Sequence, residues 1–173
     1  MKTADLKKHI RDIPDFPQEG IIFKDISTLL KNKEAFRKSI DELARKFGKE
    51  RIDYVVGVEA RGFIFGAALA YKLGVGFIPV RKKGKLPYKT KSVTYKLEYG
   101  TDTLEIHEDA LAPNVRVLVV DDLLATGGTI KAVVDLIIAQ KATIVGVAFL
   151  VELRFLKGKE RLKDLPIHSV IQY

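Results

Sequence analysis

The chain has 173 residues, of which 47% are hydrophobic, and its 30 basic and 22 acidic side chains give a formal net charge of +8. A chain of this size can bury a full core, and we expect one domain over residues 1–173. The absence of cysteine excludes disulfides, cysteine-based zinc sites and a thiol nucleophile, and the three histidines are not spaced as metal ligands. We expect a cytoplasmic protein with no membrane partner, because no signal region or membrane-spanning stretch is evident.

The first fifty residues combine a turn with an amphipathic helix. Residues 14–20 contain two prolines and a glycine, so they cannot continue a helix and turn the chain into an apolar segment that begins at Ile21. Residues 34–47 place apolar side chains along one helical face. We therefore expect this helix to pack on the core.

Four apolar runs predict buried strands, with helical patterns between some of them. The expected strands are Tyr54–Val58, Val75–Val80, Val115–Val120 and Thr143–Leu150. The expected helices are Phe63–Leu73 and Ile130–Ala139. Alternating units of this kind predict an α/β fold with a central parallel sheet flanked by helices.

The positive charge is concentrated directly after the second predicted strand. Residues 81–96 hold seven basic and no acidic side chains. They begin at the strand end where open α/β sheets bind ligands, so a pyrophosphate group is a sufficient explanation for the charge, with a solvated basic loop as the alternative for individual lysines. Residues 90–106 alternate polar and apolar side chains, which predicts a hairpin that projects over the sheet end.

Two adjacent carboxylates, Asp121 and Asp122, come at the end of the third predicted strand. The loop of small residues that follows comprises Ala125, Thr126, Gly127, Gly128 and Thr129. The start of the next predicted helix, which Thr126 or Thr129 would cap, offers free backbone N–H groups to a phosphate, and the glycines allow close approach. Carboxylates accept hydrogen bonds from hydroxyls. The pattern therefore predicts a sugar phosphate, with its ribose on the carboxylates.

The alternative is an ordinary strand-to-helix turn in which both carboxylates cap backbone groups. That arrangement would leave them partly buried beside Leu123 and Leu124, at a cost of roughly several kcal/mol. Other nucleotide motifs are missing: the sequence contains no G-x-x-x-x-G-K-[ST], and no G-x-G-x-x-G follows a strand. The interpretations as a P-loop nucleotide site or a dinucleotide-binding site therefore lose their main support.

The acidic pair and the Ala-Thr-Gly-Gly-Thr run together resemble the phosphoribosyl pyrophosphate (PRPP) motif of the type I phosphoribosyltransferases. Further segments, in the same order as in the members that act on adenine, are residues 16–17, 20–27, 59–63, 81–87 and 97–100. The resemblance covers essentially the whole chain. It implies the type I fold, with a small N-terminal hood (about residues 1–32) and a flexible β-hairpin over the site (about residues 85–106).

The resemblance implies transfer of the 5-phosphoribosyl group from PRPP to adenine, which gives AMP and pyrophosphate in purine salvage. It also implies a homodimer, and magnesium that arrives with PRPP and is held largely by substrate oxygens and water. The 5′-phosphate would lie in the Ala125–Thr129 loop and the ribose on Asp121 and Asp122. Pyrophosphate would lie on Glu59, Ala60, Arg61, Arg81, Lys82 and Lys85.

Some of these residues have a second interpretation. Arg61 alone could pair with a helix-end carboxylate, and Arg81 could reach the site of a neighbouring subunit. The resemblance places adenine beside Ile22, Phe23 and Lys24, where Phe23 would stack on the base and main-chain groups of its two neighbours would read its edge. Without the resemblance, Phe23 would be assigned to the core.

The hairpin carries two further residues of the family pattern, Glu98 and Tyr99. The resemblance implies that Glu98 moves a proton on the base and that Tyr99 helps to cover the ribose phosphate when the hairpin closes. Without it, Glu98 would be taken as a solvent-facing strand residue.

Two alternatives to adenine transfer stay open at the level of sequence. Because base choice depends on a few hydrogen bonds, hypoxanthine, guanine or xanthine could replace adenine. A PRPP-sensing regulator that binds nucleic acid would need a helix-turn-helix or a basic helix face, and residues 34–47 show neither clearly. We therefore expect PRPP and adenine as partners, and no nucleic acid.

Overall fold

A seven-stranded sheet in the order β5-β6-β4-β3-β7-β8-β9 forms the centre of the computed structural model, which describes residues 3–96 and 100–173. Its strands are β3 (Tyr54–Val58), β4 (Gly76–Lys82), β5 (Thr90–Lys96), β6 (Thr101–His107), β7 (Arg116–Leu124), β8 (Thr143–Glu152) and β9 (Ile167–Gln172). Strands β4, β3, β7, β8 and β9 pair in parallel, while the antiparallel β5–β6 hairpin joins the edge at β4. The parallel sheet and the hairpin predicted from the sequence are confirmed.

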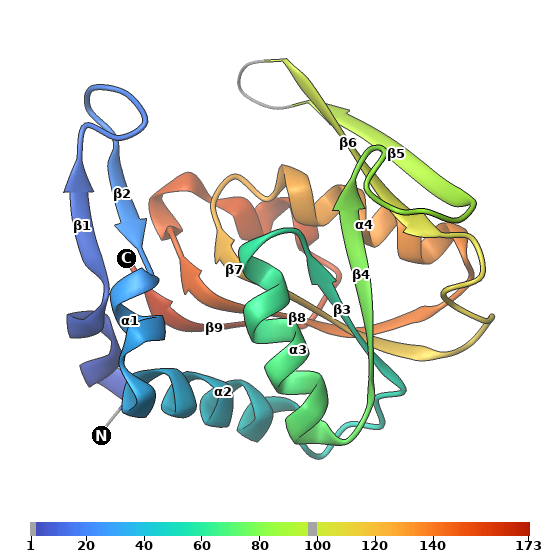
Figure 1. Cartoon of the computed structure of the whole chain (residues 1–173), viewed down its shortest axis with the longest axis horizontal. Helices are drawn as coiled ribbons and strands as arrows, with labels where there is room; N and C mark the ends of the chain where they lie inside the picture. The colour runs from blue at the N-terminus through green and yellow to red at the C-terminus, as the bar shows by residue number, and fades with distance from the viewer. Residues whose placement is uncertain (1–2, 97–99) are drawn as a thin grey trace.

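Helices cover both faces of this sheet (Figure 1). They are α1 (Ser27–Lys31), α2 (Lys33–Phe47), α3 (Arg61–Leu73) and α4 (Gly128–Ala139), with 3-10 turns η1 (Thr3–His9), η2 (Arg154–Leu156) and η3 (Gly158–Leu162). None of the helices in the described part of the chain is long and apolar enough to cross a bilayer.

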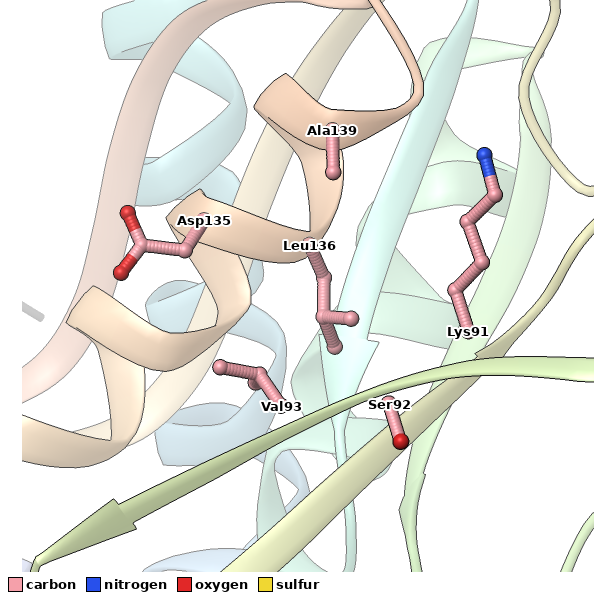
Figure 2. A pocket seen from close by; sticks show the side chains of 6 residues that line it. All are labelled: Lys91, Ser92, Val93, Asp135, Leu136 and Ala139. Atoms are coloured by element: carbon pink, nitrogen blue, oxygen red, sulfur yellow. The ribbon is translucent and has the colours of Figure 1, made fainter.

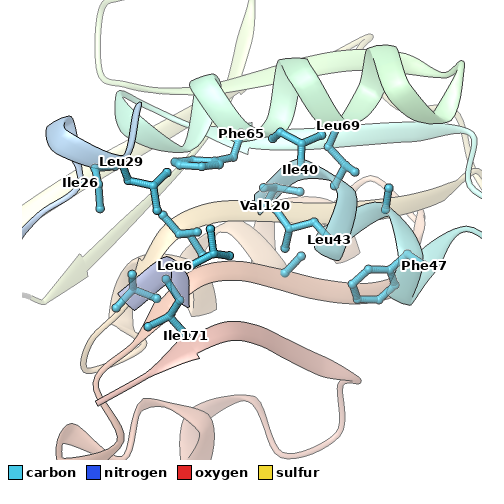
Figure 3. Close-up of a cluster of buried hydrophobic side chains, with 14 of the residues drawn as sticks. Leu6, Ile26, Leu29, Ile40, Leu43, Phe47, Phe65, Leu69, Val120 and Ile171 are labelled. Atoms are coloured by element: carbon cyan, nitrogen blue, oxygen red, sulfur yellow. The ribbon is translucent and has the colours of Figure 1, made fainter. Parts of the chain in front are cut away.

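Two hydrophobic cores lie on opposite faces of the sheet. Successive side chains of a strand point to opposite faces, so Leu118 and Val120 of β7 join the core under α2 and α3, whereas Val117 and Val119 join the core under α4. Figure 3 shows part of the first core, where Phe65 of α3 lies among side chains from α1, α2 and β7. The sheet is therefore covered on both sides, as its unbroken apolar strands predict.

The N-terminal segment forms a separate two-stranded sheet. Strands β1 (Arg11–Pro14) and β2 (Ile22–Asp25) pair in an antiparallel register, and the predicted turn of residues 14–20 connects them. In Figure 1 this pair stands beside β9 and the C-terminus, apart from the hairpin. We call residues 3–32 the hood.

Several element boundaries differ from the sequence predictions. Strand β7 continues to Leu124, because its pairing with β8 extends beyond the apolar run, so both carboxylates lie inside the strand. Helix α4 begins at Gly128, and the prediction of a threonine cap is wrong: its N-cap is Gly127, with φ of +82° and no side-chain capping bond. Glycine adopts this left-handed conformation without strain, so the helix starts directly after Gly127, and neither Thr126 nor Thr129 is its N-cap.

Candidate active site at the ends of β3 and β7

The loop between β7 and α4 forms one wall of the candidate site. All five residues predicted to hold the phosphate, Ala125 to Thr129, line a hollow of about 70 Å³ together with Asp121. A Cβ atom on Gly127 would lie 2.5 Å from the carbonyl oxygen of Gly158, so a side chain does not fit there. The free N–H groups at the start of α4 make this concave surface suitable for an anion.

Gly158, which sequence reasoning missed, supports this loop from behind. A Cβ atom on it would lie 2.9 Å from Cδ1 of Leu124 and 3.1 Å from the backbone nitrogen of Gly127, and it would also overlap the carbonyl oxygen of Ala125. Two backbone segments thus touch without side chains between them. A single glycine between two lysines carries no local signal of such a contact, because the partner loop is distant in sequence.

The acidic pair is buried at the end of β7, with Asp121 only 9% and Asp122 only 6% exposed. Burial raises the pKa of Asp121 well above its usual range, and the neighbouring Asp122 raises it further. Burial also raises the pKa of Asp122, although the guanidinium of Arg61 opposes this shift. Oδ1 of Asp121 accepts a hydrogen bond of 2.9 Å from the backbone nitrogen of Asp122. One backbone contact expected from the alternative, an ordinary strand-to-helix turn, is therefore present.

The first turn of α3 packs tightly against the acidic pair. A Cβ atom on Gly62 would lie 2.7 Å from Oδ1 of Asp121 and 3.1 Å from the carbonyl oxygen of Val120. Glycine at this position therefore lets α3 approach the end of β7 closely. The same approach brings the preceding residue, Arg61, to Asp122.

Arg61 connects two parts of the predicted site. Its Nε atom lies 2.8 Å from Oδ2 of Asp122, and its guanidinium carbon lies 5.2 Å from the centroid of the Phe23 ring. Arg61 thus does pair with a carboxylate, at a strand end and not at a helix end. The residues predicted for ribose and for adenine become neighbours through this one side chain.

Four of the six residues predicted to bind pyrophosphate, Glu59, Arg81, Lys82 and Lys85, form a second group at the end of β4. Glu59 pairs with Arg81 at 2.9 Å and accepts a hydrogen bond of 3.0 Å from the nitrogen of Lys82. The hydrogen bond from Arg81 lowers the pKa of Glu59. Arg81 also donates to the carbonyl oxygen of Lys85 at 3.0 Å, and Nζ of Lys82 lies 3.0 Å from Oδ2 of Asp102. Both cations therefore have carboxylate partners here.

The hood supplies the residues predicted for adenine. Phe23 is half-buried and stacks edge-to-face with Phe16 at 5.2 Å between ring centroids, outside both hydrophobic cores of the described residues. The alternative assignment of Phe23 to the core is therefore wrong. Ile22 is 55% exposed, and the side chain of Lys24 pairs with Asp12 at 2.8 Å. The main chain of β2 thus lies beside an accessible aromatic surface.

The hairpin reaches residues 125–129, which we call the phosphate loop, through Tyr95. Its hydroxyl lies 3.4 Å from Oγ1 of Thr129, and burial raises its pKa. The sequence did not single out Tyr95. Its side chain lies on the same face of the alternating strand as that of Val93, and both pack against the core under α4. Glu98 and Tyr99 lie outside the described residues.

A second hollow, of about 350 Å³, lies between β5 and α4. Val93 of β5 and Leu136 of α4 line it, together with Asp135 (Figure 2). Its lining contains neither carboxylate of the acidic pair and none of the phosphate loop. The smaller hollow therefore holds residues predicted to bind a sugar phosphate, although it encloses less space.

Comparison with known proteins identifies the family of the chain. Residues 25–170 match the family described as the phosphoribosyl transferase domain. The adenine phosphoribosyltransferase of Syntrophotalea carbinolica is 59% identical over 169 residues, which cover 98% of this chain and 99% of the relative.

Two solved structures are similar over nearly the whole chain. The adenine phosphoribosyltransferase of Thermoanaerobacter pseudethanolicus has a TM-score of 0.96 and 51% identity, covering 99% of this chain and 100% of that one. The Giardia lamblia enzyme, solved with 9-deazaadenine, has a TM-score of 0.95 and 38% identity, covering 100% of this chain and 98% of that one. This chain belongs to the phosphoribosyltransferases, within the adenine phosphoribosyltransferase family.

Proposed function

We propose that the chain transfers the 5-phosphoribosyl group of PRPP to adenine and releases AMP and pyrophosphate. The observation that carries this proposal is the position of Arg61, which contacts Asp122 and the ring of Phe23. A ribose on the acidic pair would therefore present its anomeric carbon toward a base stacked on Phe23. The Giardia lamblia relative, which binds 9-deazaadenine, supports adenine as that base.

The reaction breaks the bond between the anomeric carbon and pyrophosphate while a nitrogen of adenine attacks. Positive charge grows on the ribose ring, where Asp121 and Asp122 would lie, and negative charge grows on the leaving group, where Arg61 and Lys82 would lie. No covalent intermediate with the protein is needed. Catalysis would consist of positioning and electrostatic stabilisation.

The ion pairs of the site would rearrange when PRPP binds. Arg61 now pairs with Asp122, and Lys82 pairs with Asp102. A pyrophosphate group offers these cations a stronger anionic partner. As Arg61 turns toward it, Asp122 would become available to the ribose hydroxyls, so binding of the leaving group would activate the ribose site.

The remaining roles follow the family pattern. Backbone N–H groups of residues 125–129 would hold the 5′-phosphate, and Glu59 and Ala60, with Lys85, would complete the pyrophosphate site. Ile22 and Lys24 would read the edge of adenine through their main chains. Glu98 would move a proton on the base, and Tyr99 would cover the ribose phosphate.

Magnesium would enter as part of the PRPP complex, bound by substrate oxygens and water, which are ligands that this ion prefers. It would neutralise charge on the pyrophosphate. The described residues contain no group of three or more His, Cys, Asp or Glu side chains that could hold a metal. The protein's contribution would therefore be to orient the substrate that carries the ion.

Several broader features also remain proposals. We propose that residues 1–173 act as one domain, with the hairpin of about residues 85–106 as a mobile cover. We further propose a cytoplasmic homodimer in which Arg81 reaches the neighbouring site. Neither nucleic acid nor a membrane is needed as a partner for this activity.

The deciding experiment measures pyrophosphate release from PRPP and magnesium with adenine, hypoxanthine, guanine or xanthine supplied separately. We expect rapid turnover with adenine alone, giving AMP. Preference for another purine would contradict the assignment of the base. No turnover with any of the four would favour a PRPP-sensing regulator, which a salt-dependent mobility shift with nucleic acid would then support.

A further inference from the structure

Tyr173, directly after β9, lies where the hood meets the main sheet. The Nζ atoms of Lys7 and Lys24 each lie 4.1 Å from the centroid of its ring. Lys7 belongs to η1 and Lys24 to β2, so one aromatic ring contacts two segments from the opposite end of the chain. An ammonium group over an aromatic ring is attracted by the ring's quadrupole, more strongly where water is excluded.

Both lysines are also held by oxygen atoms. Nζ of Lys7 donates to the carbonyl oxygen of Gln172 at 2.9 Å, and Nζ of Lys24 donates to Oδ1 of Asp12 at 2.8 Å. The side chain of Lys24 is only 11% exposed, and burial raises the pKa of Tyr173. The ring and the Lys24 ammonium therefore meet in a partly desolvated place, where the attraction is strongest.

Tyr173 itself is fixed to the main sheet by its backbone. Its nitrogen donates to the carbonyl oxygen of Glu152, and its carbonyl oxygen accepts from the nitrogen of Arg154, both at 2.9 Å. Among the described residues, β1 and β2 pair with each other and with no strand of the large sheet. A lone two-stranded sheet is marginal by itself, so side-chain contacts must position it.

We propose that Tyr173 is a positioning residue for the adenine site and acts through Lys24. This inference rests on the proposed function, in which Phe23 and the main chain of β2 contact the base. Lys24 directly follows Phe23, whose ring also contacts Arg61. Strand β2 is thus held on two sides of the base site, to α3 through Arg61 and to β9 through Tyr173, while Leu6 and Leu29 anchor the rest of the hood in the core. Loss of the second attachment leaves β2 free to shift relative to the ribose site.

The test compares Tyr173→Leu, which removes the aromatic ring, with Tyr173→Phe, which keeps it. Tyr71→Leu is the matched control, because Tyr71 lies on α3 and is 90% exposed. We expect Tyr173→Leu to raise KM for adenine about tenfold, from the loss of two cation–π contacts. KM for PRPP should change less than about twofold, since the two cations over the ring, Lys7 and Lys24, both belong to the hood. Tyr173→Phe should match the wild type.

A second readout does not depend on activity. Amide hydrogen exchange over residues 11–25 should be faster in Tyr173→Leu than in the wild type or in Tyr173→Phe. A cooperative melting transition should show that Tyr173→Leu is still folded. An unchanged KM for adenine with unchanged exchange would overturn the proposal, as would equal increases in both KM values. Failure of the wild type to use adenine would instead refute the proposed function, and the exchange result would still decide whether Tyr173 positions the hood.

Discussion

Nε of Arg61 lies 2.8 Å from Oδ2 of Asp122, so the cation proposed to bind pyrophosphate forms an ion pair with a carboxylate proposed to bind the ribose. This contact compensates part of the buried charge of the acidic pair before substrate arrives. Under the proposed function it would also couple the two halves of the PRPP site, because movement of Arg61 toward pyrophosphate would expose Asp122 to the ribose.

Replacing Asp121 with Asn should separate activity from stability. Burial raises the pKa of Asp121, so the folded state disfavours its charged form, and an uncharged amide removes that cost at neutral pH. We expect the melting temperature to stay the same or to rise. Loss of charge beside the ribose should lower kcat/KM for PRPP by about 100-fold. Normal activity with a large fall in melting temperature would show that the carboxylate is purely structural.

Asp25 should make the hood sensitive to acid. Hydrogen bonds from Ser27 and Arg11 lower its pKa from 3.8 to about 2. Because the folded state binds this proton more weakly than the unfolded state, the stabilisation is complete above pH 3.8 and is lost as pH falls toward about 2. Asp25→Asn should therefore melt below the wild type at pH 7, and the difference should disappear near pH 2. Glu19→Gln, in the exposed loop of the hood, is the control; equal effects of both changes would refute the assignment.

Gly158→Ala should damage PRPP binding without a direct contact to substrate. The added methyl group would lie 2.9 Å from Leu124 and 3.1 Å from the backbone of Gly127, so the phosphate loop must shift. Overpacking of this kind costs about 1–3 kcal/mol. We expect KM for PRPP to rise about tenfold or more while the protein stays folded by circular dichroism. Lys163→Ala, an exposed change just after the same turn, should leave KM unaltered.

Glu98→Gln tests the proton-transfer role that the family pattern assigns. We expect kcat to fall by about 100-fold or more, because an amide cannot exchange the proton that a general acid or base moves. KM for PRPP should stay near the wild-type value, since the change keeps the size of the side chain. Steady-state kinetics with adenine provide the measurement, and unchanged turnover would end this assignment.

The sequence by itself determined the features that neighbouring residues encode. Unbroken apolar runs such as Tyr54–Val58 require burial on both faces, so they predict strands of a parallel sheet, and the strand appears with the same bounds. Likewise, the small residues of 125–129 could be assigned to the turn from β7 into α4, because turn chemistry is local, although Gly128 and Thr129 already belong to the helix. Where the apolar pattern ended before the backbone pairing did, as at Asp121, the predicted boundary fell short.

Only the tertiary structure decided which distant segments meet. The contact of Gly158 with the phosphate loop, and that of Tyr173 with Lys7 and Lys24, join residues that no local pattern relates. The packing of whole elements places β9 beside η1 of the hood and brings α3 against β7, which carries the acidic pair. These contacts depend on the packing of whole elements, which is why the sequence predicted the loop that would hold a phosphate but not the residues that hold the loop and the hood in place.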